Sequence, residues 1–170
     1  FSKIYQIKSP RVLEIGAGLG LSAYHARNFK IKDYTILDLS LGSLSQAFFF
    51  GSTIGKKNII IGDEIKNYDN KSEEFTDKIK LVQSTELELV PDNIDITLNC
   101  DSITEMSFEQ AQIYIKLASK KSKYFLSLNH DNNSFVISEI FKNTDFKRLY
   151  RVPSWYRQGY NEELYINTSI

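Results

Sequence analysis

The chain has 170 residues and a mass of 19.6 kDa, which suits one globular domain. Twenty-one Lys and Arg balance twenty-one Asp and Glu. Proteins that neutralise nucleic-acid phosphates usually carry excess positive charge, so we expect no nucleic-acid partner. No apolar run reaches the 18 to 20 residues of a membrane-spanning helix, and a single cysteine suits a reducing compartment. These features predict a cytoplasmic protein without a membrane span.

Strand and helix patterns alternate along the chain. The sequence predicts seven strands, at residues 11–15, 34–37, 79–83, 94–98, 124–128, 146–152 and 162–167. Helices are predicted at residues 19–29, 41–52 and 134–142, and from a capping serine at position 107. The second helix has an apolar stripe made of Leu41, Leu44, Ala47 and Phe48, a pattern that normally faces the core. Residues 63–78 are strongly polar and predict a surface insertion. The alternation indicates an α/β fold with a parallel sheet covered by helices.

In a parallel sheet, ligands bind beyond the carboxyl ends of the strands. The first predicted strand ends in Glu14-Ile15-Gly16-Ala17-Gly18-Leu19-Gly20. Glycines there let the backbone turn tightly and bring its N–H groups close to a ligand. A dinucleotide motif would need glycine at position 21, where the chain has Leu21. Glu14 precedes the first glycine and suits a ligand that carries a positive amino group.

The second predicted strand ends at Asp38, 20 residues after Gly18. A carboxylate can accept hydrogen bonds from both hydroxyls of a ribose. A lone aspartate at a strand end is more often a helix cap or a turn former. The spacing from the glycine loop favours a ligand at this position.

The Glu-x-Gly-x-Gly-x-Gly segment resembles motif I of class I S-adenosylmethionine-dependent methyltransferases. The resemblance implies a Rossmann-like fold with a mostly parallel seven-stranded sheet, an antiparallel last strand and helices on both faces. It implies S-adenosylmethionine as cofactor, with the glycines near its methionine part and Asp38 on its ribose. A polar residue after the third strand would contact adenine, and Ile61-Gly62-Asp63 is a rival to Ser84-Thr85-Glu86 for that place. The expected cofactor-binding residues are Glu14, Gly16, Ala17, Gly18, Gly20, Asp38, Leu39, Ser84, Thr85, Glu86 and Asn99.

The segment after the fourth predicted strand, Asn99-Cys100-Asp101-Ser102, indicates the acceptor chemistry. It lacks the Asn-Pro-Pro-Tyr type of sequence that methylates amino groups of nucleobases and the Pro-Cys pair of cytosine carbon methyltransferases. Cys100 lies in an apolar run and is predicted to be a small core residue. An acceptor oxygen is therefore favoured. A hydroxyl needs a general base, and the candidates are Asp101 and His130.

The last predicted loop, residues 152–163, combines aromatic faces with hydrogen-bonding side chains, as a sugar site requires. Its segment 154–160, together with residues 99–107 and 124–130, resembles a family of sugar O-methyltransferases associated with bacterial surface polysaccharide synthesis. The expected substrate-binding residues are Glu105, Trp155, Tyr156, Arg157 and Tyr160. A rival interpretation is that Trp155 only packs against the sheet edge.

The resemblance to this family implies a methyltransferase of sugar hydroxyls, with a small-molecule or glycan acceptor. On this resemblance, we expect residues 1–170 to form a single methyltransferase domain without the N-terminal helices that often complete the acceptor pocket. The alternatives are an oxidoreductase that binds NAD or a nucleotide-sugar and a methyltransferase-like scaffold without activity. No His, Asp or Glu spacing predicts a metal site, and the oligomeric state is not predicted.

Overall fold

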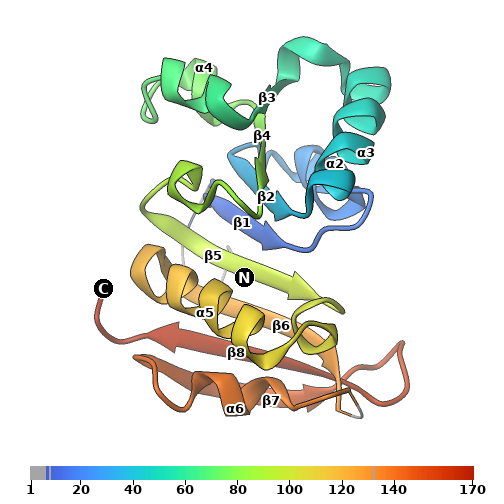
Figure 1. Cartoon of the computed structure of the whole chain (residues 1–170), viewed down its shortest axis with the longest axis vertical. Helices are drawn as coiled ribbons and strands as arrows, with labels where there is room; N and C mark the ends of the chain where they lie inside the picture. Colours follow the sequence, from blue (N-terminus) through green and yellow to red (C-terminus); the bar gives the residue numbers. More distant parts are fainter. Residues whose placement is uncertain (1–6, 8, 132) are drawn as a thin grey trace. The chain divides into compact units, whose positions relative to one another are not determined.

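The computed structural model describes residues 7, 9–131 and 133–170 (Figure 1). The chain forms two compact units, with unit 1 extending to Pro91 and unit 2 running from Asp92 to Ile170. Each unit has four described strands, so the described residues form eight strands where the sequence predicts seven. No described helix is long and apolar enough to cross a membrane.

Unit 1 contains a parallel sheet in the order β3-β4-β2-β1. Its strands are β1 (Val12–Ile15), β2 (Tyr34–Asp38), β3 (Ile59–Ile61) and β4 (Ile79–Gln83). The register pairs Ile15 with Leu37 and Asp38 with Gln83, so β1, β2 and β4 end along one edge of the sheet. Most side chains of these three strands are buried, as expected for a parallel sheet covered on both faces.

The additional strand is β3, which the sequence pattern did not predict. It has only three residues and pairs with β4 at the edge of the sheet. Strands usually have five or six residues, so a run of three isoleucines is too short to identify by pattern.

The helices of unit 1 are α2 (Leu21–Ala26), α3 (Ser40–Phe50) and α4 (Glu73–Thr76), and Figure 1 shows α3 and α4 on opposite sides of β3 and β4. Short helical turns follow α2 and α3 and precede α4, at Arg27–Phe29, Gly51–Gly55, Lys56–Asn58 and Gly62–Asn67. The polar segment 63–78 lies largely at the surface, but Phe75 of α4 is buried.

Helix α3 does not bury its apolar stripe, contrary to the usual rule. Leu41, Leu44 and Phe48 are 76%, 67% and 82% exposed. The helix instead buries Ser43, Gln46 and Phe50. The helical period identifies the stripe correctly but does not decide which face meets the sheet. The hydrogen bonds that the Gln46 amide donates, described below, offset part of the cost of burying its polar group.

The amino end of the unit 1 sheet contains a buried lysine, Lys80 of β4. Its ammonium donates to Asp33 Oδ1 at 2.6 Å and to the carbonyl oxygens of Lys78 at 3.0 Å and Phe75 at 3.3 Å. Asp33 also accepts a hydrogen bond from Arg11 Nε at 2.7 Å. Burial lowers the pKa of Lys80 to about 8, although the Asp33 carboxylate opposes this shift.

Unit 2 contains a mixed sheet in the order β5-β6-β8-β7. Its strands are β5 (Ile94–Cys100), β6 (Ser122–His130), β7 (Phe146–Pro153) and β8 (Tyr160–Asn167). Strand β6 is parallel to β5, whereas β8 is antiparallel to both of its neighbours, β6 and β7. This confirms the predicted antiparallel last strand. It also makes β7 parallel to β6, so the loop after β7 lies at the carboxyl end of β6.

Two helices accompany this sheet, α5 (Phe108–Lys121) and α6 (Ile137–Phe141), and a short helical turn precedes α5 at Ile103–Glu105. A similar turn at Leu87–Leu89 belongs to unit 1. Ser107 caps α5 as predicted, because its Oγ accepts a hydrogen bond from the Gln110 backbone N–H at 3.2 Å. Phe125 of β6 packs edge-on against Phe141 of α6, and Phe141 stacks on Tyr165 of β8 with ring centroids 4.0 Å apart.

Candidate functional site

The glycine loop after β1 adopts backbone dihedral angles that are strained for residues with a side chain. Gly16, Gly18 and Gly20 have φ values of 70°, 56° and 85°, in the left-handed region that glycine adopts without strain. A Cβ added at Gly20 would lie 2.6 Å from Phe50 Cζ, so this glycine also permits close packing. A Cβ added at Gly18 would meet nothing within 4 Å. The loop therefore keeps an open surface at Gly18. The neighbouring Ala17 is half-buried.

Glu14 is a buried carboxyl group directly before this loop. Its Oε2 accepts a hydrogen bond from Tyr34 OH at 2.8 Å. Burial raises the pKa of Glu14, hydrogen bonds from Tyr34 and Ser22 oppose the shift, and the charge of Asp38 adds to it. A positively charged ligand group beside Glu14 would favour its ionised form.

Asp38 ends β2 with its carboxylate held from two sides. Oδ1 accepts from the Leu39 backbone N–H at 2.8 Å, and Oδ2 accepts from Gln46 Nε2 at 2.7 Å. A Cβ added at Gly42 would lie 2.8 Å from Asp38 Oδ1, so glycine makes room for the carboxylate against α3. A carboxylate has about four acceptor positions, so each oxygen retains one for a ligand hydroxyl. Leu39, beside it, is exposed.

The residues after β4 lie next to Asp38 in the sheet of unit 1. The Ser84 backbone N–H donates to the Asp38 carbonyl oxygen at 2.8 Å, and Gln83 N donates to Glu86 Oε2 at 3.3 Å. The rival segment 61–63 begins with the last residue of β3, a strand that lies one position further from β2 than β4 does. This arrangement favours the turn of Ser84, Thr85 and Glu86 over its rival for contact with a ligand held by Asp38.

Asn99 joins the carboxyl ends of β5 and β6 in unit 2. Asn129 Nδ2 donates to Asn99 Oδ1 at 2.8 Å and to Ser127 Oγ at 2.7 Å, and Asn99 Nδ2 donates to Ser102 Oγ. Asn99 is buried, so these bonds use its side chain to fix the strand ends. The network was not predicted, because it requires knowledge of which strands are neighbours.

Three predicted residues of unit 2 form one cluster, Asp101, Arg157 and Tyr160. Arg157 Nη2 donates to Asp101 Oδ2 at 2.8 Å and to Tyr160 OH at 2.6 Å, and Tyr160 OH lies 2.9 Å from both Asp101 oxygens. The guanidinium also lies over the Tyr160 ring, 3.7 Å from its centroid. Asp101 has a φ of 60°, which is uncommon for a residue with a side chain and often marks a functional position. The hydrogen bond to Asp101 raises the pKa of Tyr160.

His130 ends β6 beside this cluster, and its ring meets the Tyr160 ring edge-on with centroids 5.0 Å apart. A Cβ added at Gly159 would lie 2.2 Å from His130 Nε2, and Gly159 has a φ of 81°. Glycine is therefore strongly favoured at position 159, which is not among the predicted site residues. The Gly-Tyr pair at the end of a loop was the available signal for a tight approach.

The remaining predicted residues of unit 2 are exposed. Trp155 is 94% exposed and Tyr156 is 58% exposed, so the interpretation that Trp155 packs against the sheet edge is wrong. Glu105 is exposed on the turn after β5, and its charge contributes to the raised pKa of Tyr160. Cys100 is exposed, so its predicted core position is also wrong, because it is the last residue of β5.

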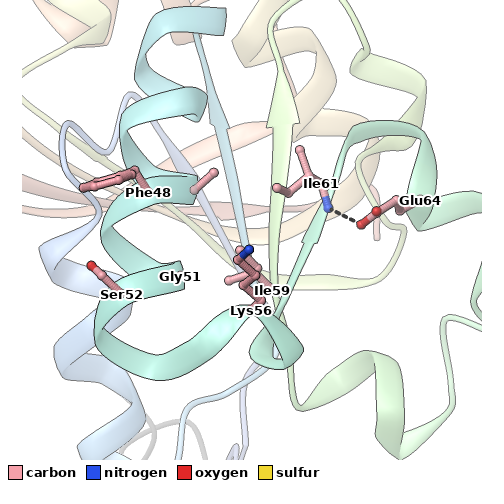
Figure 2. A pocket seen from close by; sticks show the side chains of 8 residues that line it. Phe48, Gly51, Ser52, Lys56, Ile59, Ile61 and Glu64 are labelled. Atoms are coloured by element: carbon pink, nitrogen blue, oxygen red, sulfur yellow. Dashed lines mark hydrogen bonds between the residues drawn. The ribbon is translucent and has the colours of Figure 1, made fainter.

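A groove of about 550 Å³ in unit 1 was not predicted (Figure 2). It lies between the end of α3 and strand β3 and is mostly apolar. Its lining residues are Ala47, Phe48, Gly51, Ser52, Lys56, Ile59, Ile61 and Glu64. None of the predicted cofactor or substrate residues belongs to it.

Comparison with known proteins identifies the fold. No protein-family model matches the chain, and no curated protein matches its sequence. The mitomycin 7-O-methyltransferase MmcR superposes with a TM-score of 0.66 at 11% identity, over 93% of this chain and 49% of its own. Magnesium protoporphyrin IX methyltransferase from Synechocystis, solved with bound S-adenosylmethionine, gives a TM-score of 0.63 at 12% identity, over 98% and 74% of the two chains.

An O-methyltransferase family 2 protein from Planctomyces limnophilus, in complex with apigenin, gives a TM-score of 0.62 at 12% identity. This match covers 92% of this chain and 49% of the other. The chain therefore has the Rossmann-like fold of class I methyltransferases, as the glycine motif predicts. It spans about half the length of MmcR and of the Planctomyces protein.

Proposed function

We propose that the chain is an S-adenosylmethionine-dependent O-methyltransferase and that residues 1–170 act as one methyltransferase domain. The observation that carries the proposal is the arrangement at the end of β1 and β2. The glycines of the loop have left-handed backbone angles, and the surface at Gly18 is open. The same unit contains the buried Glu14 and the Asp38 carboxylate, which hydrogen bonds hold in place. Solved structures with this fold include a methyltransferase with bound S-adenosylmethionine.

Each residue of this arrangement has a role that its chemistry supports. The Glu14 carboxylate would pair with the amino group of the methionine part, and the backbone at Gly16 and Gly18 would approach that part closely. The free acceptor positions of Asp38 would bind the ribose hydroxyls. Leu39 and the turn of residues 84–86 would contact adenine. When bound, the cofactor supplies a methyl group on a positively charged sulfur.

We propose a hydroxyl acceptor, and specifically a sugar, bound by unit 2. Arg157 and Tyr160 present fixed hydrogen-bonding groups, while Trp155 and Tyr156 present exposed aromatic faces. Flat apolar faces combined with fixed polar groups suit a sugar ring. The acceptor would be a nucleotide-sugar or a glycan, consistent with surface polysaccharide synthesis.

The acceptor hydroxyl must lose its proton as oxygen attacks the methyl group. Asp101 already accepts hydrogen bonds from Arg157 and Tyr160, so a proton moving to it would compete with both. We therefore favour His130 as the general base and assign Asp101 to holding Arg157 and Tyr160 in place. Loss of turnover in His130→Ala with retained cofactor binding would support this assignment, whereas full turnover would contradict it.

Calorimetric titration with S-adenosylhomocysteine tests the cofactor proposal. Wild type should bind, and Asp38→Ala should lose about 1–3 kcal/mol of binding free energy because ribose hydroxyls lose their partner. Asp69→Ala removes an exposed carboxylate outside the candidate site and serves as the matched control. Absence of binding by wild type, or tighter binding of NAD than of S-adenosylhomocysteine, would refute the proposal.

A methyl-transfer assay tests the acceptor. Nucleotide-sugars, free glycans and non-sugar phenols should be compared with the product mass recorded. Methylation of sugars alone supports the proposal, and methylation of phenols alone refutes the sugar assignment. Cofactor binding without turnover on any acceptor would favour a binding scaffold.

A further inference from the structure

Gln46 of α3 connects two parts of the proposed cofactor site. Its Nε2 donates to Asp38 Oδ2 at 2.7 Å and to the Gly18 carbonyl oxygen at 2.8 Å. The side-chain amide has two N–H donors, which matches one bond to each acceptor. One side chain thus ties the glycine loop after β1 to the carboxylate at the end of β2.

The burial of this amide needs an explanation. Gln46 is fully buried, and its Oε1 has no hydrogen-bond partner among the described residues. A buried acceptor without a partner is destabilising, and an apolar side chain at the same place would avoid that cost. Helix α3 contains several leucines and phenylalanines, yet its buried face includes a glutamine. Stability of the fold alone does not account for this choice.

We propose that Gln46 is a positioning residue for the cofactor. The inference rests on the proposed function and extends it to a residue that is too buried to touch the ligand. With Leu39 N on Oδ1 and Gln46 on Oδ2, the Asp38 carboxylate has one fixed orientation and one free acceptor position on each oxygen. The bond to Gly18 holds the loop at a set position relative to that carboxylate. Cofactor therefore meets a preorganised site and loses less free energy in ordering it.

Gln46→Met tests this role because methionine has a similar unbranched shape and no amide. The variant loses the two hydrogen bonds together with the unpartnered oxygen, so its melting temperature should fall only modestly. Its affinity for S-adenosylhomocysteine should nevertheless fall about tenfold. Ser43→Ala is the matched control, because Ser43 is also buried on α3 with a hydroxyl that has no partner among the described residues, and contacts neither Asp38 nor Gly18 in any described hydrogen bond. Ser43→Ala should keep wild-type affinity.

A double-mutant cycle separates positioning from a general effect on the fold. If Gln46 acts through Asp38, the affinity losses of Gln46→Met and Asp38→Ala should be far from additive, and the pair should bind about as weakly as Asp38→Ala alone. A cofactor analogue that lacks the ribose hydroxyls should lose less affinity in Gln46→Met than S-adenosylhomocysteine does, because only the bond to Gly18 then matters.

Gln46→Glu provides a second variant if Gln46→Met does not fold. At pH 7 the introduced carboxylate would repel that of Asp38, so cofactor affinity should fall more than tenfold. Protonation of the introduced group should restore part of the affinity at pH 5.5. Equal affinity of wild type and a folded Gln46 variant would overturn the positioning role while leaving the proposed function intact. Failure of wild type to bind S-adenosylhomocysteine would instead refute the proposed function.

Discussion

The buried ammonium of Lys80 predicts that the protein becomes more stable as the solution becomes moderately alkaline. The pKa of Lys80 is about 8 in the folded protein, whereas a lysine ordinarily has a pKa of 10.5. Between these values the unfolded chain binds a proton that the folded protein has released. Stability then rises with pH, by up to about 1.36 kcal/mol for each pH unit.

The size of the effect follows from the pH interval. The folded protein begins to release the proton near the pKa of about 8, and pH 9.5 lies about 1.5 pH units above that value. From pH 7 to pH 9.5 the unfolding free energy should therefore increase by about 2 kcal/mol. Above pH 10 the effect reverses, because burial raises the pKa of Tyr34 and Tyr165 in the folded protein. Above about pH 10 these tyrosines lose their protons in the unfolded chain but keep them in the folded protein, so the unfolding free energy falls as pH rises.

Urea denaturation at fixed temperature measures this change, with the midpoint followed between pH 7 and pH 9.5. Lys80→Met should remove most of the rise and leave Asp33 paired with Arg11 at 2.7 Å. Lys78→Met should keep it, because the hydrogen bonds that Lys78 donates to Tyr68 and Glu74 raise its pKa rather than lowering it. A flat wild-type profile, or the same slope in Lys80→Met, would refute the reasoning.

Three further substitutions test the two units. Trp155→Ala should change the unfolding free energy by no more than about 0.5 kcal/mol because the side chain is exposed, yet raise the acceptor KM; an unchanged KM would remove Trp155 from the site. Gly159→Ala should destabilise by about 1–3 kcal/mol, since its φ of 81° and the adjacent His130 both oppose a side chain; urea midpoints measure this. Glu14→Gln should raise stability at pH 7, with a gain that shrinks toward pH 4, because the raised pKa of Glu14 means that ionisation costs stability as pH rises; equal gains at both pH values would contradict this.

The sequence predicted the parts of the fold that local patterns determine. Strands such as β2 and β4 are short, mostly apolar runs, and the Ser107 cap of α5 depends on residues three positions apart. The face of α3 that packs was not predictable in the same way. Its orientation depends on what lies opposite the helix, namely Asp38 and the carbonyl of Gly18.

The candidate site shows the same limit. The glycine loop and Asp38 stand out because their spacing along the chain carries the signal. Gln46 carries no such signal, and the Gly-Tyr pair is only a weak one for Gly159, since each residue acts on a partner from another element of the fold. Pairing of Asp101 with Arg157 joins residues 56 positions apart, so only the strand arrangement of unit 2 brings them together.

The exposed side of α3 has a practical consequence for work with the isolated chain. Residues 39–55 contain no charged side chain, and several of their largest apolar groups face solvent. A net charge near zero at neutral pH also removes the repulsion that keeps molecules apart in concentrated solution. Purified samples should therefore aggregate at high concentration and lose solubility in sulfate salts. They should be most soluble at a pH well away from the pI of 6.9.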